Sequence, residues 1–128
     1  MRLNQVTASA RDLAASTAFY QALGLRLIVQ TDHYVRFECP DSDGGEPATF
    51  SLHLDPDAAG VTATSVYFED DDLDATVGRL KAAGLAFDSD PVDQRWLWRE
   101  AWLRDPAGNR VCLYRAGEAR RFPPWRVD

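Results

Sequence analysis

The chain has 128 residues, of which 45% are hydrophobic and 27% are charged. This length supports one compact domain, and the composition excludes an intrinsically disordered protein. The net charge of −6, with scattered cations, excludes a nucleic-acid-binding protein. No apolar run approaches the roughly 20 residues that cross a membrane, and no apolar signal segment begins the chain. We expect a soluble, cytoplasmic protein with neither a nucleic-acid nor a membrane partner.

The chain contains an internal repeat. Asp12-Leu13 returns as Asp72-Leu73, and Gly24-Leu25 returns as Gly84-Leu85. Each aspartate stands where a helix N-cap is needed, because its carboxylate can accept a hydrogen bond from an unpaired N–H of the first turn. Each glycine can adopt the positive φ that ends a helix. The repeat therefore predicts one three-turn helix in each half.

Strands are predicted around both helices, because the flanking segments mix β-branched and aromatic residues with alternating polar ones. In chain order these strands are Leu3–Ala8, Arg26–Gln30, Tyr34–Cys39, Thr49–Leu54, Ser65–Phe68, Leu85–Asp88, Glu100–Arg104 and Arg110–Tyr114. Asp105–Asn109 has the composition of a hairpin turn, residues 41–45 form a looser counterpart, and residues 56–60 form a hinge.

The predicted fold class is α+β. Two β-α-β-β-β modules, residues 1–56 and 61–117, form a curved mixed sheet with an open concave cavity in a single domain of residues 1–117. Residues 118–128 form a C-terminal tail. The tail carries Phe122 and Trp125, which we expect to pack on a partner subunit or over the cavity mouth, since they would otherwise be exposed.

The helix of each module covers only one face of its sheet. Strand alternation places on this face Val35, Phe37, Leu52, Leu54, Val66, Phe68, Ala101, Leu103, Val111 and Leu113. The opposite face receives Gln5, Thr7, Tyr34, Arg36, Glu38, Ser51, His53, Ser65, Tyr67, Glu100, Trp102, Arg104, Arg110, Cys112 and Tyr114. Mixed polar and aromatic residues favour a ligand-binding concavity, and a solvated sheet face is the alternative.

Two groups of residues carry a resemblance to a known family. The first half reads Arg11-Asp12-Leu13-Ala14-Ala15-Ser16, with Phe19-Tyr20 and Leu23-Gly24-Leu25 after it, and the second half reads Arg99-Glu100 followed by Arg104–Asn109. From Leu3 to about Gly117 the chain resembles the vicinal oxygen chelate superfamily of glyoxalase I, bleomycin and fosfomycin resistance proteins and extradiol dioxygenases. The stretch Trp96–Asn109 looks most like the bleomycin resistance type. That resemblance implies antibiotic resistance by a homodimer that binds a drug without transforming it.

The same resemblance implies where a divalent metal would bind in the enzymes of the superfamily. The matching positions are Gln5, His53, Ser65 and Cys112, with Gln5 matched to Ser65 and His53 matched to Cys112 by the repeat. Family enzymes usually present His or Gln, Glu, His and Glu, so both carboxylates are missing here. We therefore expect no cofactor, and Gln5, His53 and Cys112 as ligands if a metal does bind. Without a carboxylate base, glyoxalase I activity is not expected.

The predicted ligand-binding residues are Gln5, Arg36, His53, Ser65, Tyr67, Trp102, Arg110 and Cys112, and no catalytic residue is assigned. Trp102 would stack on a ligand, and Arg36 and Arg110 would anchor an anionic group or pair with nearby glutamates. Cys112 is a small buried residue or, alternatively, a nucleophile.

The leading hypothesis is a metal-free homodimer that sequesters a small, partly aromatic molecule. The first alternative is a divergent metal-dependent lyase, isomerase or dioxygenase that uses Gln5 and His53. The second alternative is a structural or regulatory dimer with a vestigial cleft.

Overall fold

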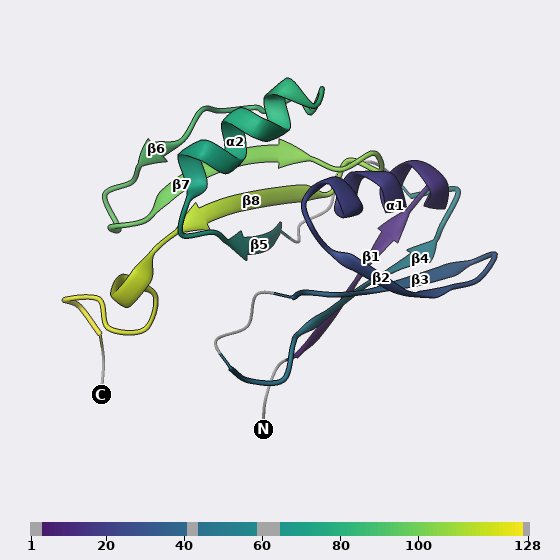
Figure 1. The fold of residues 1–128 in the computed structure, drawn as a ribbon, viewed down its shortest axis with the longest axis horizontal. Coiled ribbons are helices and arrows are strands. Elements are labelled where there is room, and N and C mark those ends of the chain that lie inside the picture. The colour runs from purple at the N-terminus through teal and green to yellow at the C-terminus, as the bar shows by residue number, and fades with distance from the viewer. Residues whose placement is uncertain (1–3, 41–43, 59–64, 127–128) are drawn as a thin grey trace. The chain divides into compact units, whose positions relative to one another are not determined.

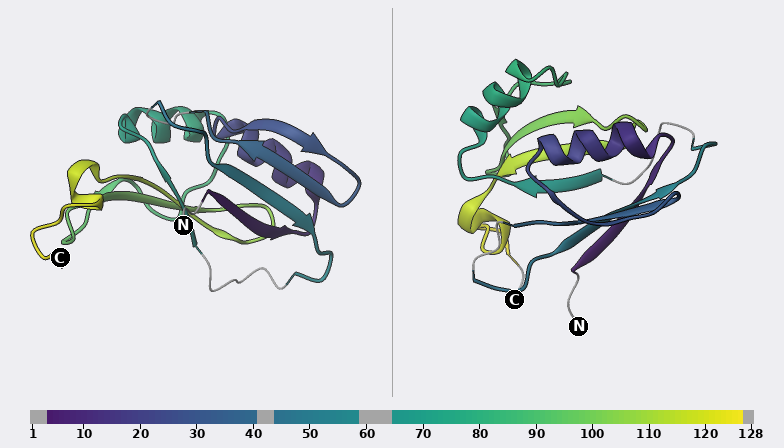
Figure 2. Two further views of the ribbon diagram at one scale, coloured as in Figure 1. Left: turned by 90° about the horizontal axis from the view of Figure 1, so that it is seen from below. Right: turned by 45° about the vertical axis from the view of Figure 1, so that its right-hand side comes forward.

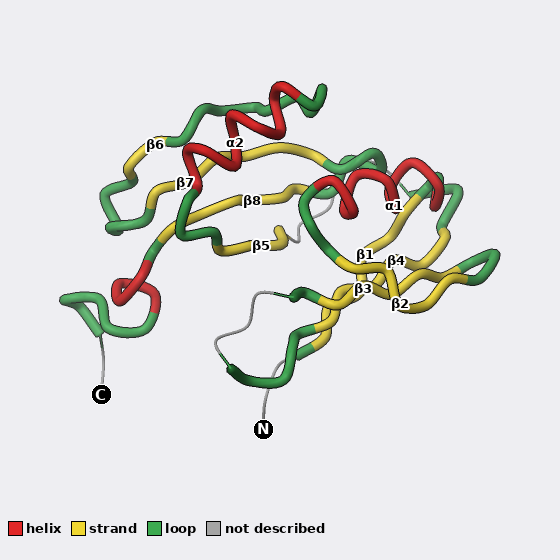
Figure 3. Tube along the Cα trace, viewed as in Figure 1, coloured by secondary structure: helices red, strands yellow, loops and turns green. Residues whose placement is uncertain are grey.

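A computed structural model describes residues 4–40, 44–58 and 65–126. The chain divides into two compact units (Figure 1). The first unit comprises residues 1–61 together with 105–109, and the second comprises residues 62–104 together with 110–128. Within the described residues, each unit has one α-helix and one four-stranded sheet (Figure 3), which confirms the predicted α+β class.

The two sheets have the same topology. The first unit contains β1 (Gln5–Ala10), α1 (Leu13–Ala22), β2 (Arg26–Gln30), β3 (Tyr34–Glu38) and β4 (Thr49–Leu54), with strand order β1-β4-β3-β2. The second unit contains β5 (Ser65–Glu69), α2 (Leu73–Ala82), β6 (Val92–Asp93), β7 (Arg99–Arg104) and β8 (Arg110–Arg115), with order β5-β8-β7-β6. The first and last strands of each repeat are parallel, and the other pairs are antiparallel.

Helix α1 has the ends that the sequence predicts. The Asp12 carboxylate accepts a hydrogen bond from the backbone N–H of Ala15 at 3.0 Å. Gly24 follows the helix with a φ of 102°, a conformation that L side chains rarely adopt. The backbone N–H of Leu25 then donates to the carbonyl oxygen of Tyr20 at 3.1 Å, which closes the last turn.

The predicted cap of α2 is wrong. The side chain of Asp72 makes no capping hydrogen bond, although its backbone occupies the N-cap position. Asp70 serves instead: one oxygen of its carboxylate accepts from the Asp72 backbone N–H at 2.8 Å, and the other accepts from the Thr76 hydroxyl at 2.7 Å. The acidic run carries more than one aspartate before the helix, and the sequence alone did not distinguish which of them would bind its start.

The predicted strand Leu85–Asp88 does not form as a strand. Only Phe87 makes an isolated bridge, with Leu103, and the edge strand beside β7 is the short β6. The backbone N–H groups of Asp88 and Ser89 both donate to Trp102 O, at 2.7 and 3.4 Å, and the Ser89 hydroxyl accepts from Trp102 N at 3.1 Å. The Ser89 side chain thus takes the place of a backbone carbonyl as the acceptor for Trp102 N, which interrupts the regular hydrogen-bond ladder between the two segments.

The other strands agree with the sequence prediction to within a few residues. β1 extends to Ala10, two residues beyond the predicted end, because it pairs with the whole of β4. Three predicted segments, the strand Leu3–Ala8, the loop 41–45 and the hinge 56–60, lie partly outside the described residues.

Each core lies between a helix and the apolar face of its sheet. In the first unit the buried side chains are Tyr20, Val35, Phe37, Phe50 and Leu52, and in the second they are Leu73, Val77, Leu80, Ala101, Leu103, Val111 and Leu113. Figure 2 (left) shows α2 on one side of β7 and β8, so α2 does not cover the other face of these two strands. Leu54, Val66 and Phe68 are only partly buried, because they lie on strand ends and on the edge strand β5.

The turn Asp105–Asn109 belongs to the first unit and is hydrogen-bonded within it. Gly108 has a φ of 88°, and the Asp105 carboxylate accepts from the backbone N–H groups of Ala107 and Asn109 at 3.0 and 2.8 Å. The buried Tyr20 hydroxyl donates to the other oxygen of Asp105 at 2.7 Å. The sequence predicted this turn, and the structure adds that Tyr20 anchors it.

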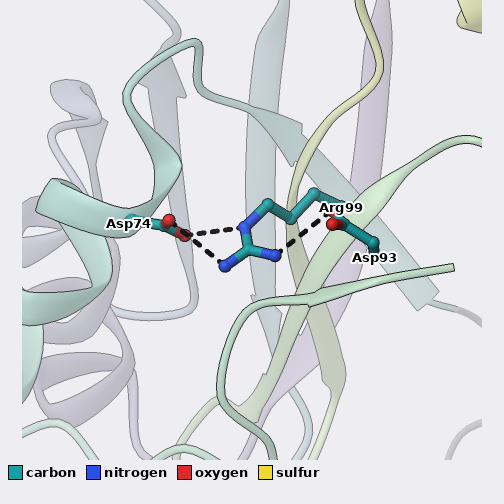
Figure 4. A network of polar contacts seen from close by, with 3 residues as sticks. All are labelled: Asp74, Asp93 and Arg99. Carbon is teal, nitrogen blue, oxygen red and sulfur yellow. Dashed lines mark hydrogen bonds and ion pairs between the residues drawn. The ribbon is translucent and has the colours of Figure 1, made fainter.

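An exposed ion-pair network links α2 to the edge of its sheet (Figure 4). The guanidinium of Arg99 donates to both carboxylate oxygens of Asp74, at 2.9 and 3.2 Å, and to Asp93 at 3.2 Å. This pairing raises the pKa of Arg99 and lowers that of Asp74. Because these groups are exposed to solvent, the network positions α2 and β6 more than it stabilises the fold.

A 3-10 helix, Gly117–Arg120, joins the second unit's last strand to the tail. Phe122 and Trp125 are 58% and 57% exposed, and the guanidinium groups of Arg121 and Arg126 lie over the Phe122 ring. The predicted packing of the tail on a partner subunit therefore stays a prediction. Neither α-helix of the described chain has the length and apolar character of a membrane span.

Candidate functional site

The first unit presents a polar face, formed by the side chains that point away from its apolar core. Backbone register aligns these residues in three rows across β1, β4 and β3: Gln5, Thr49 and Glu38; Thr7, Ser51 and Arg36; Ser9, His53 and Tyr34. Every member carries a polar group, in contrast to the apolar face of the same strands. Sequence alternation predicted most of this surface.

A chain of hydrogen bonds crosses the polar face. Gln5 Nε2 donates to Ser51 Oγ at 2.6 Å, and the Thr49 hydroxyl donates to Gln5 Oε1. Ser51 Oγ lies 2.7 Å from Tyr34 Oη, which accepts from Arg36 Nε at 2.9 Å. Arg36 is therefore turned toward Tyr34 on its own strand. Sequence reasoning missed Tyr34, Ser51 and Thr49 as members of one network, although alternation had placed Tyr34 and Ser51 on this face.

His53 lies apart from Gln5. Gln5 pairs with Thr49, four residues from His53 along β4, so their Cα atoms are about 13 Å apart along the strand. The His53 side chain is exposed, and its ring centroid is 6.4 Å from that of His33. The structure does not bring Gln5 and His53 together within the first unit.

The second unit presents a face that is largely aromatic, which we call the aromatic face: Tyr67, Trp98, Trp102 and Tyr114. Tyr67 meets the other three rings edge-on, with centroid distances of 5.4 Å to Trp102, 5.7 Å to Tyr114 and 6.0 Å to Trp98. Trp98 and Tyr114 stack at 4.6 Å with an interplanar angle of 20°. Edge-to-face and stacked pairs at these distances attract one another, so the cluster is ordered.

A buried carboxylate holds two tryptophans at this face. Glu100 is 3% exposed, and its two oxygens accept from the indole N–H groups of Trp96 at 2.8 Å and Trp102 at 3.1 Å. A buried carboxylate requires such donors. Alternation placed Glu100 on this face, but the sequence carried no signal that it would bind both indoles rather than Arg110.

Arg110 and Cys112 also lie on the β8 side of this face. The guanidinium carbon of Arg110 is 4.3 Å from the Trp102 ring centroid, a cation–π contact. Cys112 is completely buried, and burial together with the charge of Glu100 raises the pKa of its thiol to about 12. A thiol that stays protonated at neutral pH is a poor nucleophile, so Cys112 fits the small buried residue better.

The backbone register corrects one step of the repeat alignment. Gln5 pairs with Thr49 and Ser65 pairs with Arg110, so the residue two places further along is Ser51 in β4 and Cys112 in β8. Cys112 therefore corresponds to Ser51, and the match of His53 to Cys112 is wrong. The equivalent set is Gln5, Ser51, Ser65 and Cys112.

This set does not fit a divalent metal. It contains neither an imidazole nor a carboxylate, and the Gln5 amide is already hydrogen-bonded at both ends. In the described part of the chain, no group of three or more His, Cys, Asp or Glu side chains could hold an ion. The donor chemistry thus differs from that of metal sites in proteins.

The predicted ligand-binding residues fall into two groups. Arg36 joins Gln5 through the hydrogen-bond chain of the polar face, while His53 lies at the far end of that face. Tyr67, Trp102, Arg110 and Cys112 share the face of the second unit, and Ser65 lies at its β5 edge as the register partner of Arg110. Whether these eight residues bind a ligand stays a prediction.

Comparison with known proteins places the chain in a family. No curated protein matches its sequence. A glyoxalase/bleomycin resistance protein/dioxygenase from Nocardioides has a structure with a TM-score of 0.75 at 22% identity, covering 100% of this chain and 90% of its own. A bleomycin-binding protein in complex with bleomycin gives a TM-score of 0.72 at 20% identity, covering 90% of this chain and 98% of its own.

The lactoylglutathione lyase of Agrobacterium tumefaciens gives a TM-score of 0.74 at 21% identity, covering 94% of this chain and 97% of its own. These likenesses establish the fold. The family model of the Glyoxalase/Bleomycin resistance protein/Dioxygenase superfamily matches residues 2–113. Because that match spans most of the sequence, the chain belongs to the Glyoxalase/Bleomycin resistance protein/Dioxygenase superfamily.

Proposed function

We propose that this chain is a small-molecule-binding protein that holds a planar, partly aromatic ligand on the aromatic face without a metal ion. The observation that carries the proposal is the Tyr67 ring, which is 45% exposed although three ordered aromatic rings surround it. Exposed aromatic surface of this kind stacks on flat ligands. The bleomycin complex of a structural relative supports the same class of function.

The aromatic face is organised before a ligand arrives. The Glu100 carboxylate fixes the indoles of Trp96 and Trp102, and Arg110 lies against the second of these rings. Side chains that are already ordered lose little conformational freedom on binding, so more of the contact energy contributes to affinity.

The chemistry of the equivalent positions supports the metal-independent part of the proposal. Gln5, Ser51, Ser65 and Cys112 lack the imidazole and carboxylate ligands that hold divalent ions, and the Cys112 thiol resists the ionisation that zinc binding requires. The competing function is a divergent metal-dependent lyase, isomerase or dioxygenase that uses Gln5 and His53. Elemental analysis of protein purified without chelators distinguishes the two. Stoichiometric metal that is lost in His53→Ala would contradict our proposal.

The binding experiment uses bleomycin and a panel of aromatic metabolites as probes, with melting temperature and tryptophan fluorescence as readouts. A probe at a hundredfold excess over its dissociation constant should stabilise the fold by about 2.7 kcal/mol. Trp102→Ala should weaken binding about tenfold, because one stacking contact is lost. Ile28→Ala is the matched control, since that side chain is 45% exposed on β2 of the first unit and is not part of the aromatic face. Probes that bind Trp102→Ala unchanged, or a full panel without effect, would refute the proposal.

The proposal includes a homodimer. Phe122 and Trp125 leave two large aromatic side chains more than half exposed, and such surface commonly marks an interface. Light scattering on the full chain should give the mass of a dimer. The double variant Phe122→Ser with Trp125→Ser should shift the protein toward monomer, and a monomeric full chain would contradict this part.

A further inference from the structure

The direction of the hydrogen-bond chain on the polar face can be assigned atom by atom. Gln5 Nε2 lies 3.3 Å from the carbonyl oxygen of Val6 and 2.6 Å from Ser51 Oγ. A carbonyl oxygen only accepts, so the side-chain atom beside it is the amide nitrogen. That nitrogen has a second hydrogen, which it donates to Ser51 Oγ. Ser51 Oγ is therefore the acceptor in its hydrogen bond with Gln5.

Burial fixes the next step. Ser51 is completely buried, so its hydroxyl hydrogen needs an acceptor inside the protein. Tyr34 Oη at 2.7 Å provides it, and the same oxygen also accepts from Arg36 Nε at 2.9 Å. With both donors directed at the phenol oxygen, the hydrogen of the Tyr34 hydroxyl points away from this network and remains available as a donor.

Arg36 adds positive charge beside this donor. Its Nε binds Tyr34, and its guanidinium carbon lies 5.4 Å from the Tyr34 ring centroid. None of the ion pairs within the described residues includes Arg36. The other ionisable groups that share its face are Glu38, with its register partner Arg26 on β2, at one end and the exposed His53 at the other, and β1 contributes only neutral side chains there. The two terminal amino groups of the guanidinium therefore face no carboxylate partner in this part of the chain.

We propose that Tyr34 and Arg36 form a binding site for a small carboxylate. The oxygen of the Tyr34 hydroxyl already accepts two hydrogen bonds, so only its hydrogen is left to donate, and the terminal amino groups of Arg36 only donate. A carboxylate only accepts, so the ligand satisfies all of these donors at once. Ser51 and Gln5 act as positioning residues, because they orient the Tyr34 hydroxyl without contacting the ligand. The site lies on the first unit and does not depend on the ligand proposed for the aromatic face.

The ionisation of Tyr34 is consistent with such a site. Although burial acts to raise it, the hydrogen bonds from Ser51 and Arg36 and the charge of Arg36 lower the pKa of Tyr34. The other three tyrosines all have raised pKa values. The network therefore favours negative charge on oxygen at this place, which is what a bound carboxylate supplies.

The experiment compares propionate with propionamide, which has a similar size and no charge, in amide NMR titrations of the full chain. Neither probe is aromatic, so the aromatic face does not contribute to the signal. Propionate should shift the backbone amides of β3 and β4 and bind about tenfold more tightly than propionamide, because a charge-assisted hydrogen bond is lost with the amide. Failure here would leave the aromatic-face proposal intact, since that proposal predicts shifts in β5, β7 and β8.

Three variants test the residues. Arg36→Gln should weaken propionate binding about tenfold, and Tyr34→Phe should weaken it several-fold. Arg36→Lys keeps the charge but loses the planar fork, so its affinity should lie between those of the unmodified protein and Arg36→Gln. Arg11→Gln removes one exposed positive charge elsewhere in the first unit and should leave binding unchanged. The amide spectra report whether each variant is folded.

Three results would overturn the proposal. Equal binding of propionate and propionamide would show that charge is not recognised, and unchanged affinity in folded Arg36→Gln would exclude the guanidinium. A titration with inorganic phosphate at equal ionic strength tests whether the site prefers a carboxylate or a phosphate group. Weaker binding of phosphate than of propionate supports a carboxylate site, and tighter binding refutes that assignment.

Discussion

The hydrogen bond between Tyr20 and Asp105 should make a large contribution to stability. The Tyr20 side chain is completely buried and Asp105 is 4% exposed, so both partners of this 2.7 Å bond are shielded from water. Tyr20→Phe removes the donor and leaves the aromatic contacts with Phe37 and Phe50 intact. A hydrogen bond to a charged group contributes about 2 kcal/mol, which for a chain of 128 residues corresponds to a melting temperature lower by about 7 °C.

Urea denaturation and calorimetry measure this loss. Tyr67→Phe is the matched control, because its ring is 45% exposed and the same deletion should change stability by less than about 0.5 kcal/mol. A double-mutant cycle with Asp105→Asn isolates the coupling between the two side chains. A loss in Tyr20→Phe no larger than that in Tyr67→Phe would refute the reasoning.

Tyr20 also predicts the response to alkaline pH. Burial, the charge of Asp105 and their hydrogen bond raise the pKa of Tyr20 above its ordinary value of 10.0. The folded state therefore holds the phenol proton more tightly than the unfolded state does. Its contribution to stability is complete below pH 10.0 and is lost as the pH rises above that value. Stability measured from pH 8 upward should fall less steeply in Tyr20→Phe than in the natural chain.

Three further predictions concern the second unit. Glu100→Gln should lower stability by about 2 kcal/mol in urea denaturation, because an amide nitrogen cannot accept from an indole and one of the two indole N–H groups loses its charged partner. Asp70→Ala should lower stability by about 1 kcal/mol, and Asp72→Ala by only a few tenths, since only the first carboxylate binds the start of α2. Cys112, whose pKa is raised to about 12, should resist alkylation by iodoacetamide at pH 8 until the protein is unfolded, and rapid labelling of the folded protein would contradict its burial.

Local rules explain why the repeat, the two helices and the two faces of each sheet could be predicted from the sequence. The Asp12 cap and the positive φ of Gly24 depend only on neighbouring residues. Alternation along a strand is a property of the backbone itself, so the apolar and polar faces follow once the strands are located. The Asp105–Asn109 turn was predictable for the same reason.

The register between strands was not predictable in this way, because it depends on how whole strands pack. Counting residues matched His53 to Cys112, whereas the ladders of the two units place Ser51 in that position. A displacement of two residues keeps a side chain on the same face, so alternation could not reveal the error.

The sequence by itself therefore determined the superfamily, the two-fold repeat and the residue types that each face would carry. Only the tertiary structure decided which of those residues meet: Glu100 with two indoles, and Tyr34 with Ser51 and Arg36. Several partners were chemically acceptable for each of these groups. The choice between them depends on burial and on contacts between distant segments, which no local pattern encodes.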